Sequence, residues 1–98
     1  MSSLIFGPFK QWFVDNRDEL RSRGIAVTFV QGRPTAKTGA YLDIDTEKFV
    51  ARVTLWESME LVMDALSVDN RQASIFETHQ PADIHEALVL ISEFVNRL

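Results

Sequence analysis

The stretch from Ala40 to Leu66 constrains the fold of this chain more than any other. Apolar residues recur at every second position over three segments, Ala40–Asp45, Phe49–Trp56 and Met59–Leu66. The apolar set comprises Leu42, Ile44, Phe49, Ala51, Val53, Leu55, Met59, Leu61, Met63 and Ala65. A period of two is that of a β-strand, in which successive side chains point to opposite faces. We therefore predict three antiparallel strands, joined by turns at 46–48 and 57–58, with one face of the sheet buried.

The opposite face of these strands carries the side chains best suited to binding. It combines carboxylates, one arginine and two aromatic rings, and an acidic turn adjoins it. Trp and Tyr are enriched among the hot spots of protein interfaces, so the face suits a protein partner. The alternative is that a helix end or a partner subunit covers the two aromatic rings. The predicted binding residues are Tyr41, Asp43, Asp45, Arg52, Trp56, Glu57, Glu60 and Asp64.

An amphipathic helix is predicted over residues 7–23, before the sheet. Pro8 then lies in its first turn, where the missing proline N–H costs nothing. Gly24 follows its last turn and suits the left-handed backbone that ends many helices. Phe9, Phe13 and Leu20 share one face with Trp12 beside them, so Trp12 is predicted to belong to the core.

A second amphipathic helix is predicted from Pro81 to Arg97. Its apolar residues repeat every three or four positions and form one broad stripe. Asp83 and Glu86, three positions apart, resemble a capping box with Asp in the place of Ser or Thr. The alternative start places Pro81 in the first turn.

Two more strands complete a predicted sheet of five. The remaining elements are the strands Ile25–Val30 and Ala73–Thr78, a loop at 31–39 and a turn at 68–72. Residues 59–68 are rich in types that favour helix, so a helix is the alternative there. Sequential strands usually lie side by side. We predict a single α+β domain, residues 1–98, with a five-stranded antiparallel β-sheet meander and the N-terminal and C-terminal helices packed on one face.

Composition narrows the possible partners. The chain has no cysteine, which excludes disulfides and thiolate zinc sites. Its net charge of −4 argues against direct nucleic-acid binding, because phosphate neutralisation requires clustered Lys and Arg. No segment has the roughly 18–20 apolar residues of a membrane span, and no basic residue precedes the short N-terminal apolar stretch. We therefore expect a cytoplasmic protein with a basic protein partner.

A catalytic or metal site is the weaker interpretation of the acidic residues. Asp43 and Asp45 lie on one strand face, and paired carboxylates can act in acid–base chemistry or hold a cation, here with His79 or His85. Catalysis, however, requires a cleft that separates their pKa values, which an open sheet face lacks. We expect no enzyme, no catalytic residue, no cofactor and no metal. A homodimeric adaptor module and, less favoured, a small metal-dependent enzyme are the alternatives.

Three stretches carry a resemblance to a known family. AYLDIDTEKFVARVTLWES, DNRQASIFETHQ and IHEALVLISEFV resemble the small immunity proteins of bacterial toxin systems, in particular the TriTu-type family. The resemblance implies a protein that binds and blocks the C-terminal toxin domain of a contact-dependent growth inhibition effector. It also implies that this toxin is a tRNA-cleaving nuclease that works with elongation factor Tu. An acidic domain agrees with an inhibitor of a toxin whose surface is basic.

Overall fold

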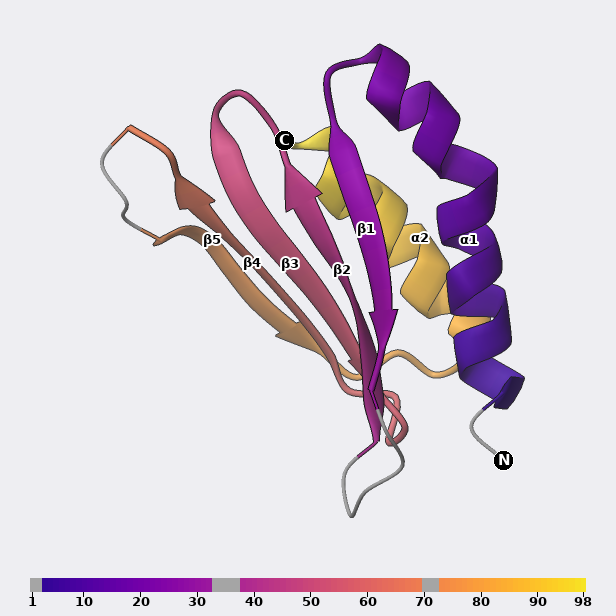
Figure 1. Cartoon of the computed structure of the whole chain (residues 1–98). Helices are drawn as coiled ribbons and strands as arrows, with labels where there is room; N and C mark the ends of the chain where they lie inside the picture. Colours follow the sequence, from indigo (N-terminus) through magenta and orange to yellow (C-terminus); the bar gives the residue numbers. More distant parts are fainter. Residues whose placement is uncertain (1–2, 33–37, 70–72) are drawn as a thin grey trace.

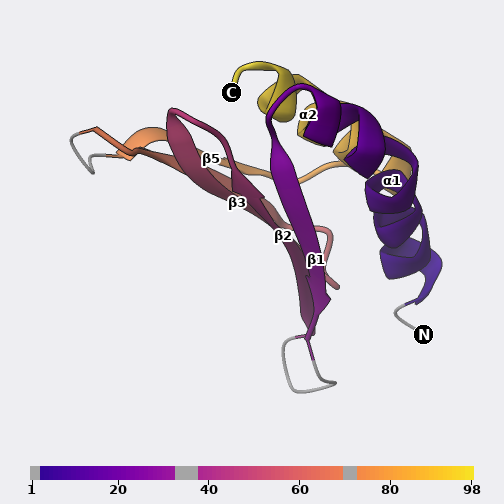
Figure 2. The same ribbon diagram turned by 45° about the horizontal axis from the view of Figure 1, so that its top comes forward.

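Seven elements make up the computed structural model, which describes residues 3–32, 38–69 and 73–98 (Figure 1). In chain order they are α1 (Ser3–Ser22), β1 (Ala26–Gln31), β2 (Gly39–Asp45), β3 (Phe49–Trp56), β4 (Leu61–Ser67), β5 (Ala73–His79) and α2 (Ile84–Asn96). The strands form one antiparallel sheet of order β1-β2-β3-β4-β5, and both helices lie on the same side of it (Figure 2). The predicted α+β meander is confirmed. Residues 33–37 of the predicted loop and 70–72 of the predicted turn lie outside the described residues.

The inner face of the sheet is the face that the alternation predicted to be buried. Its buried side chains from β2, β3 and β4 are Ala40, Leu42, Ile44, Ala51, Val53, Leu55, Leu61, Met63 and Ala65. They align across the strands, because Leu42 lies opposite Val53 and Val53 opposite Met63. The helices complete the core with Phe6, Phe9, Leu20, Ala87, Ile91, Phe94 and Val95. Burial of each large apolar side chain is worth about 1.5–3 kcal/mol, so this layer supplies most of the stability.

The β3–β4 turn differs from the prediction by two residues. β4 begins at Leu61, and Met59 lies in the turn with a φ of 73°. The Met59 N–H donates to the Trp56 carbonyl at 2.8 Å, and the Trp56 N–H donates to the Glu60 carbonyl at 2.9 Å. This is the hairpin loop in which a residue in left-handed conformation follows a type I turn. Alternation missed this turn because Met59 still packs against the core. The helical alternative for residues 59–68 is wrong, because this segment contains β4.

The first helix begins four residues before its predicted start. Pro8 is therefore inside α1 rather than in its first turn, and it removes the hydrogen bond to the Leu4 carbonyl. The additional turn includes Phe6, which is buried, and this burial offsets the lost bond. None of the described helices is long and apolar enough to cross a membrane.

Gly24 ends α1 as predicted. It has a φ of 81°, and its N–H donates to the Arg21 carbonyl at 3.0 Å. The Ile25 N–H donates to the Leu20 carbonyl at 2.9 Å, and both of these side chains are buried. This pair of bonds with its apolar contact is a Schellman motif. The motif turns the chain directly from α1 into β1.

Asp83, and not Pro81, marks the start of α2. Its Oδ1 accepts from the Glu86 N–H at 2.9 Å, and Glu86 Oε1 accepts from the Ala82 N–H at 2.8 Å. The predicted capping box is confirmed, with the return bond made one residue earlier than usual. The helix therefore begins at Ile84, three residues after the predicted start.

The carboxylate of Glu77 in β5 connects the sheet to the C-terminal end of α2 and has two partners. Arg97 Nη1 donates to Glu77 Oε2 at 2.6 Å, and His79 Nε2 lies 3.1 Å from Glu77 Oε1. The Arg97 hydrogen bond, and after it the His79 bond, lower the pKa of Glu77 to about 2. The pair connects the helix to an edge strand of the sheet.

Gly24→Ala should lower the free energy of unfolding by about 1–2 kcal/mol, because an L residue at this φ is strained. A Cβ at this position would meet no atom within 4 Å, so the loss is conformational rather than steric. Urea unfolding measures it. Gly24→Asn is the matched variant and should lose less, because Asn tolerates the left-handed region. Equal losses in the two variants would contradict this account of the helix end.

Glu77→Gln should destabilise the protein at pH 7 and have progressively less effect as the pH falls from about 4.5 to about 2. A depressed carboxylate pKa contributes stability above the ordinary pKa, and protonation removes it below. Urea unfolding at several pH values measures the difference between variant and wild type. Glu47→Gln, in the β2–β3 turn, controls for the loss of one exposed carboxylate. A difference that is constant from pH 7 to pH 3 would show that the Glu77 contacts carry no charge-dependent stability.

Candidate functional site

One side of the sheet faces away from both helices (Figure 1). The strand register places side chains of all five strands on that side. This outer face consists of Ala26, Thr28, Val30, Tyr41, Asp43, Asp45, Val50, Arg52, Thr54, Trp56, Val62, Asp64, Leu66, Phe76 and Thr78. One row crosses the whole sheet, in the order Thr28, Asp43, Arg52, Asp64 and Phe76. Because neighbours in such a row are direct cross-strand pairs, their side chains interact. The row brings three of the predicted binding residues together.

Arg52 organises the centre of the outer face. Its Nε and Nη2 donate to the two carboxylate oxygens of Asp43 at 2.7 and 3.2 Å. Its guanidinium lies 4.0 Å from the centroid of the Tyr41 ring, within cation–π range. The hydrogen bond that Arg52 donates to Asp43 is the main reason that the pKa of Arg52 is raised. Arg52 therefore holds Tyr41 and Asp43 in fixed positions.

The carboxylates of the outer face are not equivalent. Asp43 is neutralised by the bidentate pair with Arg52, whereas Asp45 is exposed at the end of β2. Asp64 is half-buried on the other side of Arg52. Burial raises its pKa, the positive charge of Arg52 lowers it, and the negative charge of Asp43 raises it again. Asp45 is thus the carboxylate of this face best placed to act on a partner at long range.

Trp56 closes one end of the outer face by lying on Gly39, its cross-strand partner. A Cβ built on Gly39 would be 2.6 Å from Trp56 Cε3, so the indole occupies the space above the glycine. Glu57 and Glu60 follow in the β3–β4 turn, at the same end of the sheet. The register places Tyr41 and Trp56 on the outer face, and both helices lie on the other side of the sheet (Figure 2). Neither helix therefore covers the two rings. The predicted binding residues therefore form a central group and an end group, while Asp45 lies at the opposite end of β2. The central group is Tyr41, Asp43, Arg52 and Asp64, and the end group is Trp56, Glu57 and Glu60.

The prediction missed an apolar part of the outer face. This apolar patch consists of Val50, Leu66 and Phe76 of the outer face together with Val68, which follows β4, and all four are exposed. Phe76 is 67% exposed and lies opposite Asp64. Val50, Leu66 and Val68 line a shallow pocket of about 300 Å³ together with Ser67. Alternation from the inward-facing Ile75 is the sequence signal that places Phe76 outside.

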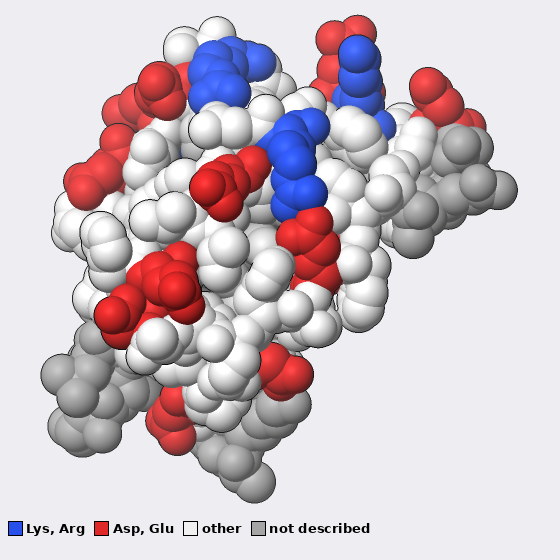
Figure 3. Space-filling model, turned by 180° about the vertical axis from the view of Figure 1, so that it is seen from behind, with Lys and Arg blue, Asp and Glu red and all other residues white. Residues whose placement is uncertain are grey.

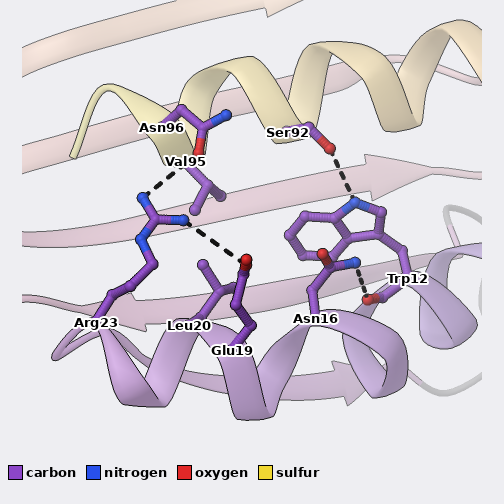
Figure 4. Close-up of a pocket in the computed structure, with 8 residues that line it drawn as sticks. All are labelled: Trp12, Asn16, Glu19, Leu20, Arg23, Ser92, Val95 and Asn96. Atoms are coloured by element: carbon purple, nitrogen blue, oxygen red, sulfur yellow. Dashed lines mark hydrogen bonds and ion pairs between the residues drawn. The ribbon is translucent and has the colours of Figure 1, made fainter.

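A groove of about 210 Å³ between the two helices is a different kind of feature (Figure 4). Trp12 Nε1 donates to Ser92 Oγ at 3.0 Å across it, and Arg23 Nη2 donates to Asn96 Oδ1 at 3.5 Å. Its polar groups thus bond to one another. The groove is therefore part of the packing contact between α1 and α2, which agrees with the predicted structural role of Trp12.

The histidines lie away from the paired aspartates. His79 is opposite the buried Leu61 and therefore faces the helix side, with Glu77 as its partner. His85 is in α2, also on the helix side. Asp43 and Asp45 are on the outer face, so the sheet separates them from both histidines. Within residues 3–32, 38–69 and 73–98, no group of three His, Asp or Glu is arranged to hold a metal ion.

Comparison with known families finds a match over residues 8–97, to the model described as "Immunity protein TriTu". The matched span includes all five strands, the whole of α2 and α1 from Pro8 onward. No curated protein matches the chain.

Gly39→Ala should lower the free energy of unfolding by about 1–3 kcal/mol, because the new methyl displaces the Trp56 ring. The same substitution in a Trp56→Ala background should be neutral or stabilising, because no ring then occupies the space. Urea unfolding of the four proteins of this double-mutant cycle measures the coupling. If Gly39→Ala has the same effect in both backgrounds, the stacked arrangement is wrong.

Proposed function

Because the chain belongs to the TriTu family of immunity proteins, we propose that it neutralises its cognate toxin by binding it with the outer face of the sheet. The family match over residues 8–97 is the observation that carries the immunity function. The choice of the outer face rests on the geometry of its side chains. Like other immunity proteins, it would act as a binding partner in a fixed ratio and not as an enzyme.

The outer face has the properties of an interface that is organised before its partner arrives. Arg52 fixes Tyr41 and Asp43, and Trp56 is fixed on Gly39. Side chains that are already ordered lose little entropy on binding, which favours affinity. The backbone beneath them is a paired sheet, so the face keeps its shape. These features support a role for Tyr41 and Trp56 as anchors in the contact.

The charge of the face supports a toxin with a basic surface. Five carboxylates lie on or beside it, those of Asp43, Asp45, Asp64, Glu57 and Glu60. The cations there, among the described residues, are Arg52 and, in the β2–β3 turn, Lys48. A nuclease binds an anionic substrate, so its active site tends to be basic, and opposite charges speed association. We propose that the toxin is a tRNA-cleaving nuclease of a contact-dependent growth inhibition system that works with elongation factor Tu. In that system the chain would bind the C-terminal toxin domain inside the cell.

Charge alone does not select the outer face. Acidic side chains also form several separate groups on the helix side, with basic side chains among them (Figure 3). Asp15, Asp18 and Glu19 of α1 are exposed there. These α1 acids define the competing interface, and any test has to include them.

Co-expression tests the immunity function directly. The C-terminal region of the protein encoded immediately upstream is expressed with and without this chain, and growth and tagged capture are scored. Immunity predicts rescued growth and a stable complex. Toxicity that persists, with no complex captured, would contradict the function for that pair.

Asp45→Lys should slow association with the toxin several-fold at low salt, and the effect should shrink as salt screens the charges. Asp18→Lys in α1 is the matched control, because it changes the net charge of −4 by the same amount. Stopped-flow or surface-plasmon kinetics at several salt concentrations measure the association rate. If Asp18→Lys slows association with the toxin and Asp45→Lys does not, the interface lies on α1 instead.

A further inference from the structure

Three residues of the apolar patch form a continuous group, and Phe76 lies on the next strand of the same face. Val50 and Leu66 are direct cross-strand partners in β3 and β4. Val68 follows Leu66 by two positions, and the two share the shallow pocket. Phe76 of the neighbouring strand β5 is the most exposed large apolar side chain among the described residues. Single exposed apolar residues are common, but a contiguous exposed group marks an interaction site.

Carboxylates border the patch. Asp45 is opposite Val50, Asp64 is opposite Phe76, and Asp69 follows Val68 in the chain. The cations beside the patch among the described residues are Arg52, which is paired with Asp43, and Lys48, whose carbonyl accepts from the Val68 N–H. The carboxylates therefore outnumber the cations that are free to face a partner. The complementary surface is an apolar side chain surrounded by lysines or arginines. A second copy of this chain would instead bring carboxylates toward carboxylates, which opposes association. Charge complementarity therefore favours a basic partner over self-association.

From this arrangement we infer that the apolar patch is the hot spot of the toxin contact, and that it receives an apolar side chain which the toxin presents within a basic surface. The inference rests on the proposed function and deepens it by dividing the outer face into two parts. The acidic part around Asp45 speeds the encounter. The patch around Phe76 and Leu66 excludes water in the complex and slows its dissociation.

The two parts predict different kinetic effects. Charge changes at the edge of an interface act mainly on association, whereas truncation of a buried apolar anchor acts mainly on dissociation. Hot-spot residues are the few whose loss is large, and aromatic side chains are frequent among them. Phe76 is the aromatic candidate here, and Leu66 at the pocket is its neighbour.

The test is the dissociation rate of the complex between the full chain and the upstream-encoded toxin region. Phe76→Ala should raise the dissociation rate by roughly tenfold or more and leave the association rate within about twofold. Leu66→Ala should raise the dissociation rate as well. Val89→Ala in α2 is the matched control, because Val89 and Leu66 are each 44% exposed, and it should behave like wild type. Circular dichroism checks that each variant is folded.

Light scattering of the wild-type chain alone completes the test, with a monomer as the expected result. If the wild type binds the toxin and both Phe76→Ala and Leu66→Ala dissociate at the wild-type rate, this inference is overturned and the proposed function stands. A wild-type dimer that Phe76→Ala converts to a monomer would also overturn it, because a second copy would then occupy the patch. Failure of the wild type to bind the toxin at all would overturn the proposed function, and this inference with it.

Discussion

Burial of one face of β2, β3 and β4 is the constraint on which the rest of the structure depends. Because nine of their side chains are packed under the helices, the register of the three strands is fixed. A slip of one residue would bring every inner side chain to the surface. The same register decides which side chains reach the outer face and which of them are neighbours. The helix ends serve this packing, since Gly24 turns α1 into β1 and Asp83 starts α2 after β5.

The strand register also determines which side chains of the outer face interact with one another. Arg52 can bind Asp43 and lie over Tyr41 only because β2 and β3 place the three side chains together. The consequence is an acidic surface with one neutralised, one half-buried and one exposed aspartate, beside an apolar patch with residues from β3, β4 and β5. Mixed character of this kind is typical of protein interfaces, in which an apolar centre has a charged rim. It agrees with membership in a family of immunity proteins, whose task is to bind.

The sequence predicted the features that depend on local pattern. Alternation located the inner face, Gly24 located the end of α1, and Asp83 with Glu86 indicated the cap of α2, although the helix was predicted to start three residues earlier, at Pro81. It failed where distant contacts override local preference. Phe6 is buried and extends α1 past Pro8, and Met59 packs on the core while its backbone forms a turn.

The sequence predicted which residues of the site face outward, but not which of them contact one another. Whether Asp43 or Asp45 pairs with Arg52 depends on the strand register, which alternation does not specify. Phe76 was missed because β5 was predicted as a strand without an assignment of its faces.

The central claim is that the outer face contacts the toxin, and methyl cross-saturation NMR of the complex tests it most directly. Saturation of an unlabelled toxin is transferred to the methyl groups of the labelled chain that lie at the interface. Val50, Leu66 and Val68 report on the outer face, and Val14 and Val89 report on the helices; all five are exposed in the isolated chain. We expect strong saturation transfer to the methyl groups of Val50, Leu66 and Val68, and little to those of Val14 and Val89. Transfer to Val14 or Val89, with Val50 and Leu66 unaffected, would contradict it.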